Sequence, residues 1–211
     1  IILLMAGFGI RLVDLKDLPL DFAPTRQLFS ALKARALYYE FLPDAPAWRQ
    51  SVAARGSFAN IEPPVMETLV AQTWRFTGEH LWIPRLYSSF FWVLGGLALF
   101  FLSRELTSTG AALISTLIYL FLPFGVIASR VFQPDPLMVA LIIFSLWALL
   151  RWQNTGQWKW AILFGLFSGL ALFVKNLSVF IILGAFLGVL MGSVGLKRAF
   201  GSVQVWLMGL L

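Results

Sequence analysis

Residues 81–102, LWIPRLYSSFFWVLGGLALFFL, form an apolar run in which Arg85 is the only charged side chain. An α-helix needs about 20 apolar residues to cross the hydrocarbon core of a bilayer, so this run is long enough to span a membrane. Transmembrane strands would instead alternate apolar and polar residues over segments of about ten, and the run shows no such alternation. It therefore predicts a membrane-spanning helix.

The rest of the chain has the same character. Of its 211 residues 59% are hydrophobic and 12% are charged, a composition outside the range of soluble domains. Pro123 should kink its helix, and Gly165 and Gly169 offer a small-residue face for close packing. We expect an all-α, polytopic transmembrane helical bundle, forming a single domain over residues 1–211. The further spanning segments are expected at residues 110–128, 136–150, 160–174 and 177–194, with a last helix opening at residue 203.

Both ends of the chain lie inside apolar sequence. The chain starts without Met in a run over residues 1–10 that is too short to span, and it stops inside another run, residues 203–211. The first run lacks the basic start and small-residue cleavage site of a signal peptide, so we interpret residues 1–13 as the end of a first spanning helix. The chain is accordingly expected to be an N-terminal fragment of a longer protein.

Residues 14–80 form a long first loop that holds most of the charges and several prolines. Residues 25–42 and 64–76 have helical periodicity, and Pro64 suits a first helical turn. These segments are expected to be amphipathic juxtamembrane helices on the membrane surface; the alternative is a pair of surface helices in a small soluble cap. The expected apolar positions are Leu28, Leu32, Ala36 and Tyr39, opposite Arg26, Lys33 and Glu40, in the first helix and Val65, Leu69 and Thr73 in the second.

The distribution of basic residues in the short loops predicts the orientation. If residues 81–102 run from outside to inside, the positive-inside bias is satisfied and the long first loop is external. The protein is then an integral protein of the plasma (inner) membrane. The inner loops carry Arg104, Arg151, Lys159, Lys197 and Arg198, and the short outer loops carry Arg130 and Lys175.

Several classes of function are excluded by composition. The net charge of +6 is spread among loops and helix ends, where it would meet lipid phosphates, so no nucleic-acid partner is expected. The absence of cysteine excludes disulfides, thiolate metal sites and cysteine nucleophiles. A membrane acyltransferase or polyprenyl-phosphate phosphatase would need a catalytic histidine, and the single His80 has no supporting motif.

Three external acids, Asp21, Glu62 and Asp135, each stand at the start of an expected helix. One interpretation is that they only cap these helices, and Pro136 after Asp135 fits that role. The other is that they converge on one catalytic site, where Asp21 and Asp135 would bind Mg²⁺ or Mn²⁺ to grip a phosphate. The remaining external acids are expected to be solvated surface: Asp14, Asp17, Glu40, Asp44, Glu67 and Glu79.

Four cations are expected on the same side of the membrane as these acids. Their ammonium or guanidinium groups would hold a phosphate or diphosphate, so we predict them as substrate-binding residues. They are Arg26, Arg85, Arg130 and Lys175.

The order of several short motifs resembles that of one enzyme family. An early loop Asp and a Pro63-Pro64 helix precede IPRLYSS at residues 83–89 and REL at residues 104–106. GAALI at residues 110–114, ASR at residues 128–130, Asp135 and GLFSGLALFVK at residues 165–175 follow. Taken together, this order is similar to that of GT-C glycosyltransferases related to protein O-mannosyltransferases and lipid A aminoarabinose transferases.

The resemblance implies a function and residue roles. Enzymes of this kind take a sugar from a polyprenyl-phosphate carrier and pass it to a lipid, glycan or protein acceptor at the outer face of the membrane. Asp21 would match the family's catalytic first-loop Asp, Asp135 an acid near metal or donor phosphate, and Lys175 a basic residue near the phosphate. Two positions depart from the pattern, because Phe22 replaces a frequent Glu and Glu62 stands where many relatives have His or Lys.

Other interpretations stay open on sequence alone. Asp14 and Asp17 compete with Asp21 for the catalytic role, and Asp21 is preferred because it lies closest to the first loop helix. A transporter would place charges near the middle of its spanning helices, whereas here they stand at helix ends. A non-catalytic membrane assembly protein, whose external loop binds a partner, is the remaining alternative.

Overall fold

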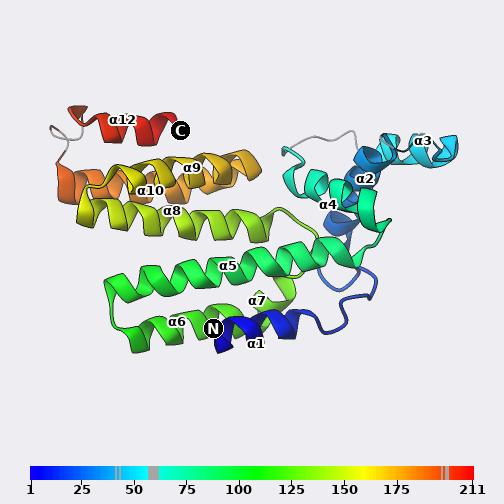
Figure 1. The fold of residues 1–211 in the computed structure, drawn as a ribbon, viewed down its shortest axis with the longest axis horizontal. Coiled ribbons are helices and arrows are strands. Elements are labelled where there is room, and N and C mark those ends of the chain that lie inside the picture. The colour runs from blue at the N-terminus through cyan, green and yellow to red at the C-terminus, as the bar shows by residue number, and fades with distance from the viewer. Residues whose placement is uncertain (41, 43, 57–61, 196, 198–199) are drawn as a thin grey trace.

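The structure is a computed structural model that describes residues 1–40, 42, 44–56, 62–195, 197 and 200–211, and their regular secondary structure is helical throughout. It has two parts, a long bundle and a smaller group of helices at one of its ends, which we term the cap (Figure 1). The cap consists of α2 (Pro24–Glu40), α3 (Ala47–Gly56) and α4 (Val65–Thr77). The bundle consists of α1 (Ile2–Arg11), α5 (Trp82–Leu106), α6 (Thr109–Phe121), α7 (Pro123–Ala128), α8 (Asp135–Thr155), α9 (Trp158–Val174), α10 (Val179–Val189) and α12 (Val203–Leu210).

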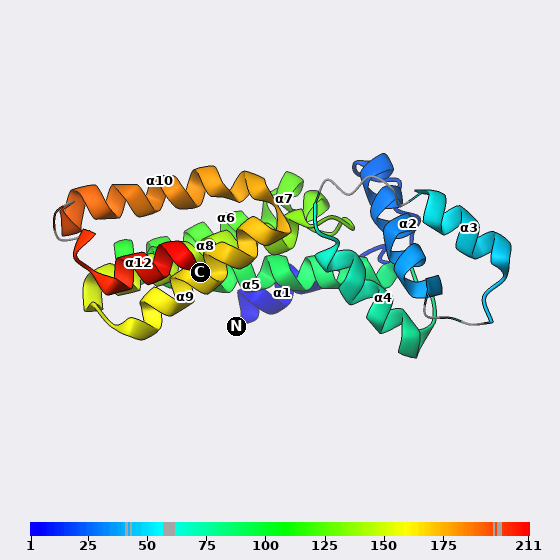
Figure 2. The ribbon, with the colours of Figure 1, turned by 90° about the horizontal axis from the view of Figure 1, so that it is seen from above.

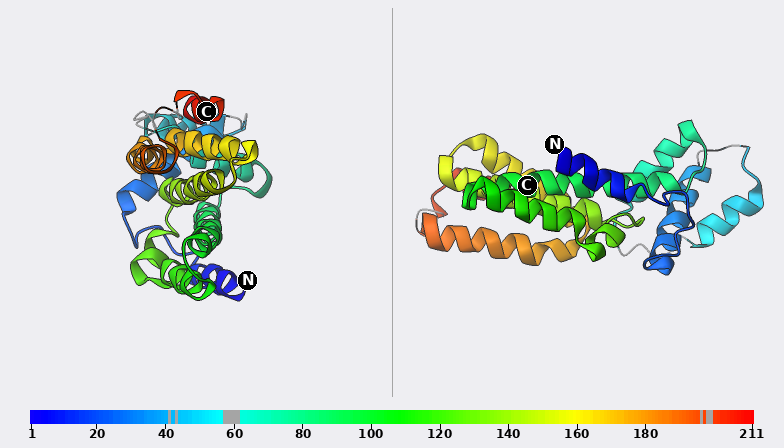
Figure 3. Two further views of the ribbon diagram at one scale, coloured as in Figure 1. Left: turned by 90° about the vertical axis from the view of Figure 1, so that its left-hand side faces the viewer. Right: turned by 90° about the horizontal axis from the view of Figure 1, so that it is seen from below.

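The bundle helices run back and forth along one axis. In Figure 1 they lie in successive layers, with α1 and α6 at one side, then α5, then α8, then α9 and α10, and α12 outermost. The views from above and end-on show the same near-parallel axes (Figures 2 and 3). Because consecutive helices alternate in direction, the start of α5, the end of α7, the start of α8 and the end of α9 all lie at the cap end. The predicted all-α transmembrane bundle is confirmed.

Within the residues that the structure describes, three helical segments are long and apolar enough to cross a membrane, namely Trp82–Leu106, Asp135–Thr155 and Asn176–Ser193. Shorter apolar helices accompany them, Ile2–Arg11, Thr109–Phe121 and Trp158–Val174. The predicted segments thus form helices, but not all of them reach spanning length by themselves. A helix of 17 residues, such as α9, is only about 25 Å long.

Proline and an extended residue set two of the breaks. The expected kink at Pro123 is a full interruption, because α6 ends at Phe121 and α7 begins at Pro123. The residue before a proline is pushed out of the helical region, and Leu122 accordingly has a ψ of 125°. Lys175 interrupts the helical path between α9 and the 3₁₀ turn Asn176–Ser178, because its backbone is extended, with φ −160° and ψ 116°.

Small residues allow the bundle helices to approach closely. At Gly95 an added Cβ would lie 2.7 Å from the Tyr119 hydroxyl and 3.2 Å from the Cα of Ala140, so α6 and α8 both press on α5 there. At Gly169 an added Cβ would clash with the backbone oxygen of Leu211, which follows α12. The predicted packing role of the glycines in α9 is confirmed, and their neighbour is the α12 segment.

The helices of the cap pack through faces that differ from those that the sequence periodicity predicted. The predicted apolar face of α2 is only partly right: Tyr39 is buried and Glu40 is exposed as predicted, but Leu28 is 42% exposed and Lys33 only 6%. The predicted face of α4 is also wrong by one position, because Met66, Val70 and Trp74 are the buried side chains. The reason is that α2 meets α4 through small residues, Ala31 and Ala34, against which the larger side chains of α4 pack. Helix α3 was not predicted.

Candidate functional site

The loop that joins α1 to α2 crosses the cap end of the bundle and is fixed there by Arg85 in the first turn of α5. Arg85 Nη1 donates to the backbone oxygens of Asp17 at 2.9 Å and Asp14 at 3.4 Å, and Nη2 donates to Asp21 Oδ2 at 2.6 Å. The Arg85 side chain is 1% exposed. Its contacts therefore make it a support for the loop, and a direct role in holding substrate stays a prediction.

Asp21 lies between two guanidinium groups. Besides Arg85, Arg130 places its Nε 3.8 Å from Asp21 Oδ2, and Arg130 Nη2 donates to the Asp14 backbone oxygen at 3.1 Å. Oδ1 accepts from the Phe22 backbone N–H at 3.2 Å. The carboxylate is partly open to solvent, so it can still reach an incoming hydroxyl while the arginines hold its position.

A second ion-pair group centres on Lys175, directly after α9. Its Nζ lies 2.9 Å from Asp135 Oδ1 at the start of α8 and 3.8 Å from Glu62 Oε1 before α4. Glu62 also pairs with Arg26 in the first turn of α2. The chain thus brings together side chains that are far apart in sequence, and two carboxylates share one ammonium group.

The structure bears on the capping interpretation of Asp135. The N-cap position of α8 is Pro134, no side-chain hydrogen bond caps the helix, and Asp135 bonds Lys175 instead. A capping role for its side chain is therefore wrong. Glu62 likewise faces Arg26 and Lys175.

Gln27 in α2 links the two groups, and sequence reasoning missed it. Its Nε2 donates to the Phe22 backbone oxygen at 2.6 Å and weakly to Asp21 Oδ1 at 3.4 Å. Its Oε1 accepts from the Phe132 N–H at 3.2 Å, in the segment that leads to Asp135. The side chain is fully buried. A glutamine beside an arginine at a helix start carries no sequence signal for such a role.

The prediction that the other acids of residues 14–80 are solvated surface is wrong for Glu67. Glu67 is only 6% exposed, and within the cap it lines a small hollow with Arg26 and Lys33. Glu79 accepts from Arg35 Nε at 2.6 Å and from the hydroxyl of Tyr39. Burial, followed by this hydrogen bond, raises the pKa of Tyr39. Asp14 and Asp17 contact the site through backbone oxygens.

The donor set at the site suits an anion better than a metal ion. Among the residues that the structure describes, no three His, Asp or Glu side chains converge as metal ligands. Asp21 faces two guanidinium groups and Asp135 faces an ammonium, so a dication would have to displace these cations. Mg²⁺ or Mn²⁺ at Asp21 and Asp135 stays a prediction, and no step below uses it.

The far end of the bundle has a different character. Glu105 there pairs with Arg151 at 3.4 Å and accepts from Trp147 Nε1 at 2.9 Å. The charges of α5 and α8 thus stand at the helix ends and not midway along them, which counts against the transporter alternative.

Comparison with known proteins identifies the family. A search of curated proteins finds no match to this chain, and a search of solved structures finds none either. The family described as dolichyl-phosphate-mannose-protein mannosyltransferase matches residues 61–211, a segment that contains Glu62, Arg85, Arg130, Asp135 and Lys175. The match agrees with the resemblance to GT-C glycosyltransferases found in the sequence. Since it covers well over half of the chain, this chain belongs to the dolichyl-phosphate-mannose-protein mannosyltransferase family of membrane glycosyltransferases.

Proposed function

We propose that this chain carries the catalytic end of a glycosyltransferase that moves a sugar from a polyprenyl-phosphate carrier to an acceptor at the outer face of the membrane. The observation that carries the proposal is the pairing of three acids with four cations between the cap and the spanning helices. Such a site lies where the phosphate of a membrane-bound lipid would meet an acceptor from the aqueous side. The acceptor is a lipid, a glycan or a protein.

On the acceptor side, Asp21 is the proposed catalytic base. An acceptor hydroxyl would donate to its carboxylate, and the hydroxyl oxygen would attack the anomeric carbon of the donor sugar. As the new C–O bond forms, the hydroxyl proton passes to Asp21. Arg85 and Arg130 fix the carboxylate for this contact, because both lie on its Oδ2 side.

On the donor side, the bond between the anomeric carbon and the phosphate oxygen breaks, and negative charge builds up on the leaving phosphate. Lys175 and Arg26 are the proposed groups that take up this charge. Both are held in place by Glu62, and Lys175 is also held by Asp135. A donor phosphate would therefore replace one of these carboxylates as the partner of Lys175. Before the donor binds, the carboxylates keep the Lys175 ammonium from being left without a counterion.

Substitution of Asp21 in the complete enzyme tests the proposal. We expect Asp21→Asn to lower transfer from a radiolabelled polyprenyl-phosphate sugar by about 10²–10⁴-fold, the usual effect of losing a catalytic base. The matched control is Asp17→Asn in the same loop, since Asp17 contacts Arg85 only through its backbone oxygen. It should keep activity within a few-fold.

Thermal unfolding separates loss of chemistry from loss of fold, because Asp21→Asn also removes a counterion of the buried Arg85. A folded Asp21→Asn enzyme with full activity would overturn the assignment. If Asp17→Asn is the inactive variant, the catalytic acid is Asp17.

A further inference from the structure

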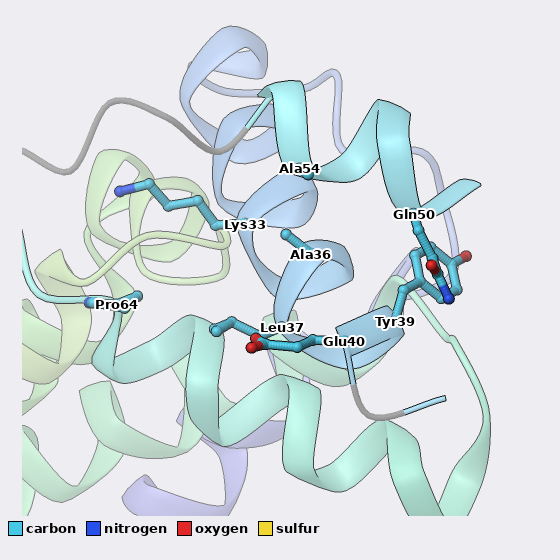
Figure 4. Close-up of a pocket in the computed structure, with 8 residues that line it drawn as sticks. All are labelled: Lys33, Ala36, Leu37, Tyr39, Glu40, Gln50, Ala54 and Pro64. Carbon is cyan, nitrogen blue, oxygen red and sulfur yellow. The ribbon is translucent and has the colours of Figure 1, made fainter. Parts of the chain in front are cut away.

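A cavity of about 490 Å³ lies in the cap between α2, α3 and the start of α4 (Figure 4). Its volume falls in the range of small-molecule sites, about 300–1,000 Å³. The side chains around it are mixed in character: Leu37 and Pro64 are apolar, whereas Lys33, Glu40 and Gln50 are polar. None of these residues carries a step of the proposed transfer.

Lys33 gives this cavity a positively charged group without a counterion among the described residues. It is 6% exposed, and in the described part of the chain its ammonium has no ion-pair or hydrogen-bond partner. Its one recorded contact is the Phe29 ring, 4.8 Å away. Its Nζ is not among the fully enclosed side-chain atoms without a partner, so solvent still reaches this ammonium, and a ligand would replace that solvent as its partner. An anion in the cavity would supply the missing partner.

The position of Lys33 relates the cavity to the candidate site. Besides the cavity, Lys33 lines a small hollow together with Arg26, Pro134 and two carboxylates, those of Glu62 and Glu67. It therefore stands between the cavity and the ion pairs under the cap. A ligand that contacts Lys33 from the cavity would therefore lie next to these ion pairs.

The other polar groups indicate what the rest of the ligand is. Figure 4 shows the Lys33 amine on one side of the cavity, with the Glu40 carboxylate and the Gln50 amide away from it. Gln50 Nε2 already donates to the backbone oxygens of Leu42 and Ala45, both at 3.4 Å, so the Gln50 amide oxygen and the Glu40 carboxylate are the groups that would accept from hydroxyls of a ligand. An anion next to Glu40 would be repelled, so the charged end of a ligand belongs at Lys33.

We propose that this cavity binds a phosphorylated polyol, with the phosphate on Lys33 and the hydroxyls toward Glu40 and Gln50. That the bound group belongs to the acceptor rests on the proposed function, whereas the binding itself does not. The same chemistry is offered by a soluble sugar or glycerol phosphate and by the headgroup of an anionic phospholipid.

Calorimetric titration of the full chain in phosphatidylcholine nanodiscs with glycerol 3-phosphate tests the binding. We expect saturable binding that Lys33→Gln weakens by at least about tenfold, and that Lys33→Arg keeps within a few-fold. Glycerol should not bind. The matched control is Arg55→Gln, which removes one positive charge from an exposed position of α3.

Further variants separate this cavity from the ion-pair site. Binding at the cavity should persist in Lys175→Gln, because Lys175 does not line the cavity. If Lys33→Gln fails to fold, Gln50→Ala should still weaken binding several-fold, since Gln50 lines the cavity from α3.

A second set of nanodiscs distinguishes the two sources of phosphate. If the ligand is a lipid headgroup, phosphatidylglycerol in the disc should compete with glycerol 3-phosphate in wild-type protein; if it is soluble, there should be no competition. Absence of glycerol 3-phosphate binding, or binding that folded Lys33→Gln leaves unchanged, would overturn the inference. Transfer assays are not involved, so its failure is distinct from failure of the proposed function.

Discussion

Gln27 shows how much one buried amide can organise at this site. Its amide nitrogen and oxygen bond the loop that carries Asp21 and the segment that leads to Asp135, respectively. We expect Gln27→Leu to lower the free energy of unfolding by about 1–3 kcal/mol, because it leaves buried backbone groups without partners. Transfer should fall by more than this loss of stability explains, since Asp21 is no longer fixed relative to Asp135.

Thermal unfolding and transfer kinetics measured on the same samples check this prediction. Gln27→Glu should behave like Gln27→Leu, because a carboxylate cannot donate to the Phe22 backbone oxygen 2.6 Å away. Gln72→Leu, at an exposed position of α4, is the control and should change little. Wild-type kinetics in folded Gln27→Glu would show that the amide is not needed to position the site.

Tyr39 gives a pH-dependent prediction at the same scale. Burial and the hydrogen bond to Glu79 raise its pKa above the ordinary value of 10.0. The folded state thus favours the neutral phenol, so this contribution is complete below pH 10 and is lost as pH rises through the raised pKa. Tyr39→Phe should cost about 1 kcal/mol at pH 8, and its difference from wild type should narrow above pH 10. Denaturant unfolding across pH 8–11 measures this; a constant difference would contradict it.

At the scale of elements, the sequence predicted where the helices lie better than it predicted which face of each cap helix is buried. The apolar runs predicted nearly every bundle helix, because the length and hydropathy of a spanning segment are properties of its own sequence. The buried face of a cap helix depends on its neighbour instead. Ala31 and Ala34 are buried because large side chains of α4, such as Trp74, fill the space beside them. The sequence of α2 does not indicate which helix packs against it. The buried Lys33 is also contrary to the usual rule that charged side chains of a surface helix face solvent.

The contact of α5 with α6 and α8 gives a matched test of element packing. We expect Gly95→Ala to destabilise the protein by about 1–3 kcal/mol, since its Cβ would meet the backbone of Ala140 and the Tyr119 hydroxyl. Gly184→Ala in α10 is the same chemical change where nothing lies within 4 Å. It should be neutral or stabilising, because alanine favours the helix. Thermal unfolding in detergent compares the two, and equal effects would show that α5 is not tightly packed at Gly95.

At the scale of the whole molecule, the antiparallel order of the bundle explains why part of the site could be predicted. Once the spanning segments are known, alternation places Arg85, Asp135 and Lys175 at one end without any knowledge of packing. Which acid meets which cation does not follow from this order, because it depends on how the loop and the cap fold over that end. The pairing of Lys175 with both Asp135 and Glu62, and the loop support from Arg85, required the structure.

The same order makes the sidedness of the membrane a single experimental question. The 211 residues contain no cysteine, so when this chain is expressed by itself a single introduced cysteine is the only thiol that a label can reach. Ser51→Cys places a thiol on α3 in the cap, and Asn154→Cys places one in the last turn of α8, at the far end of the bundle; both positions are exposed. With the basic short loops inside, a membrane-impermeant maleimide should label Ser51→Cys in intact cells and Asn154→Cys only after permeabilisation. The reverse pattern would put the site at the inner face, and labelling of both in intact cells would contradict a bundle that spans the membrane.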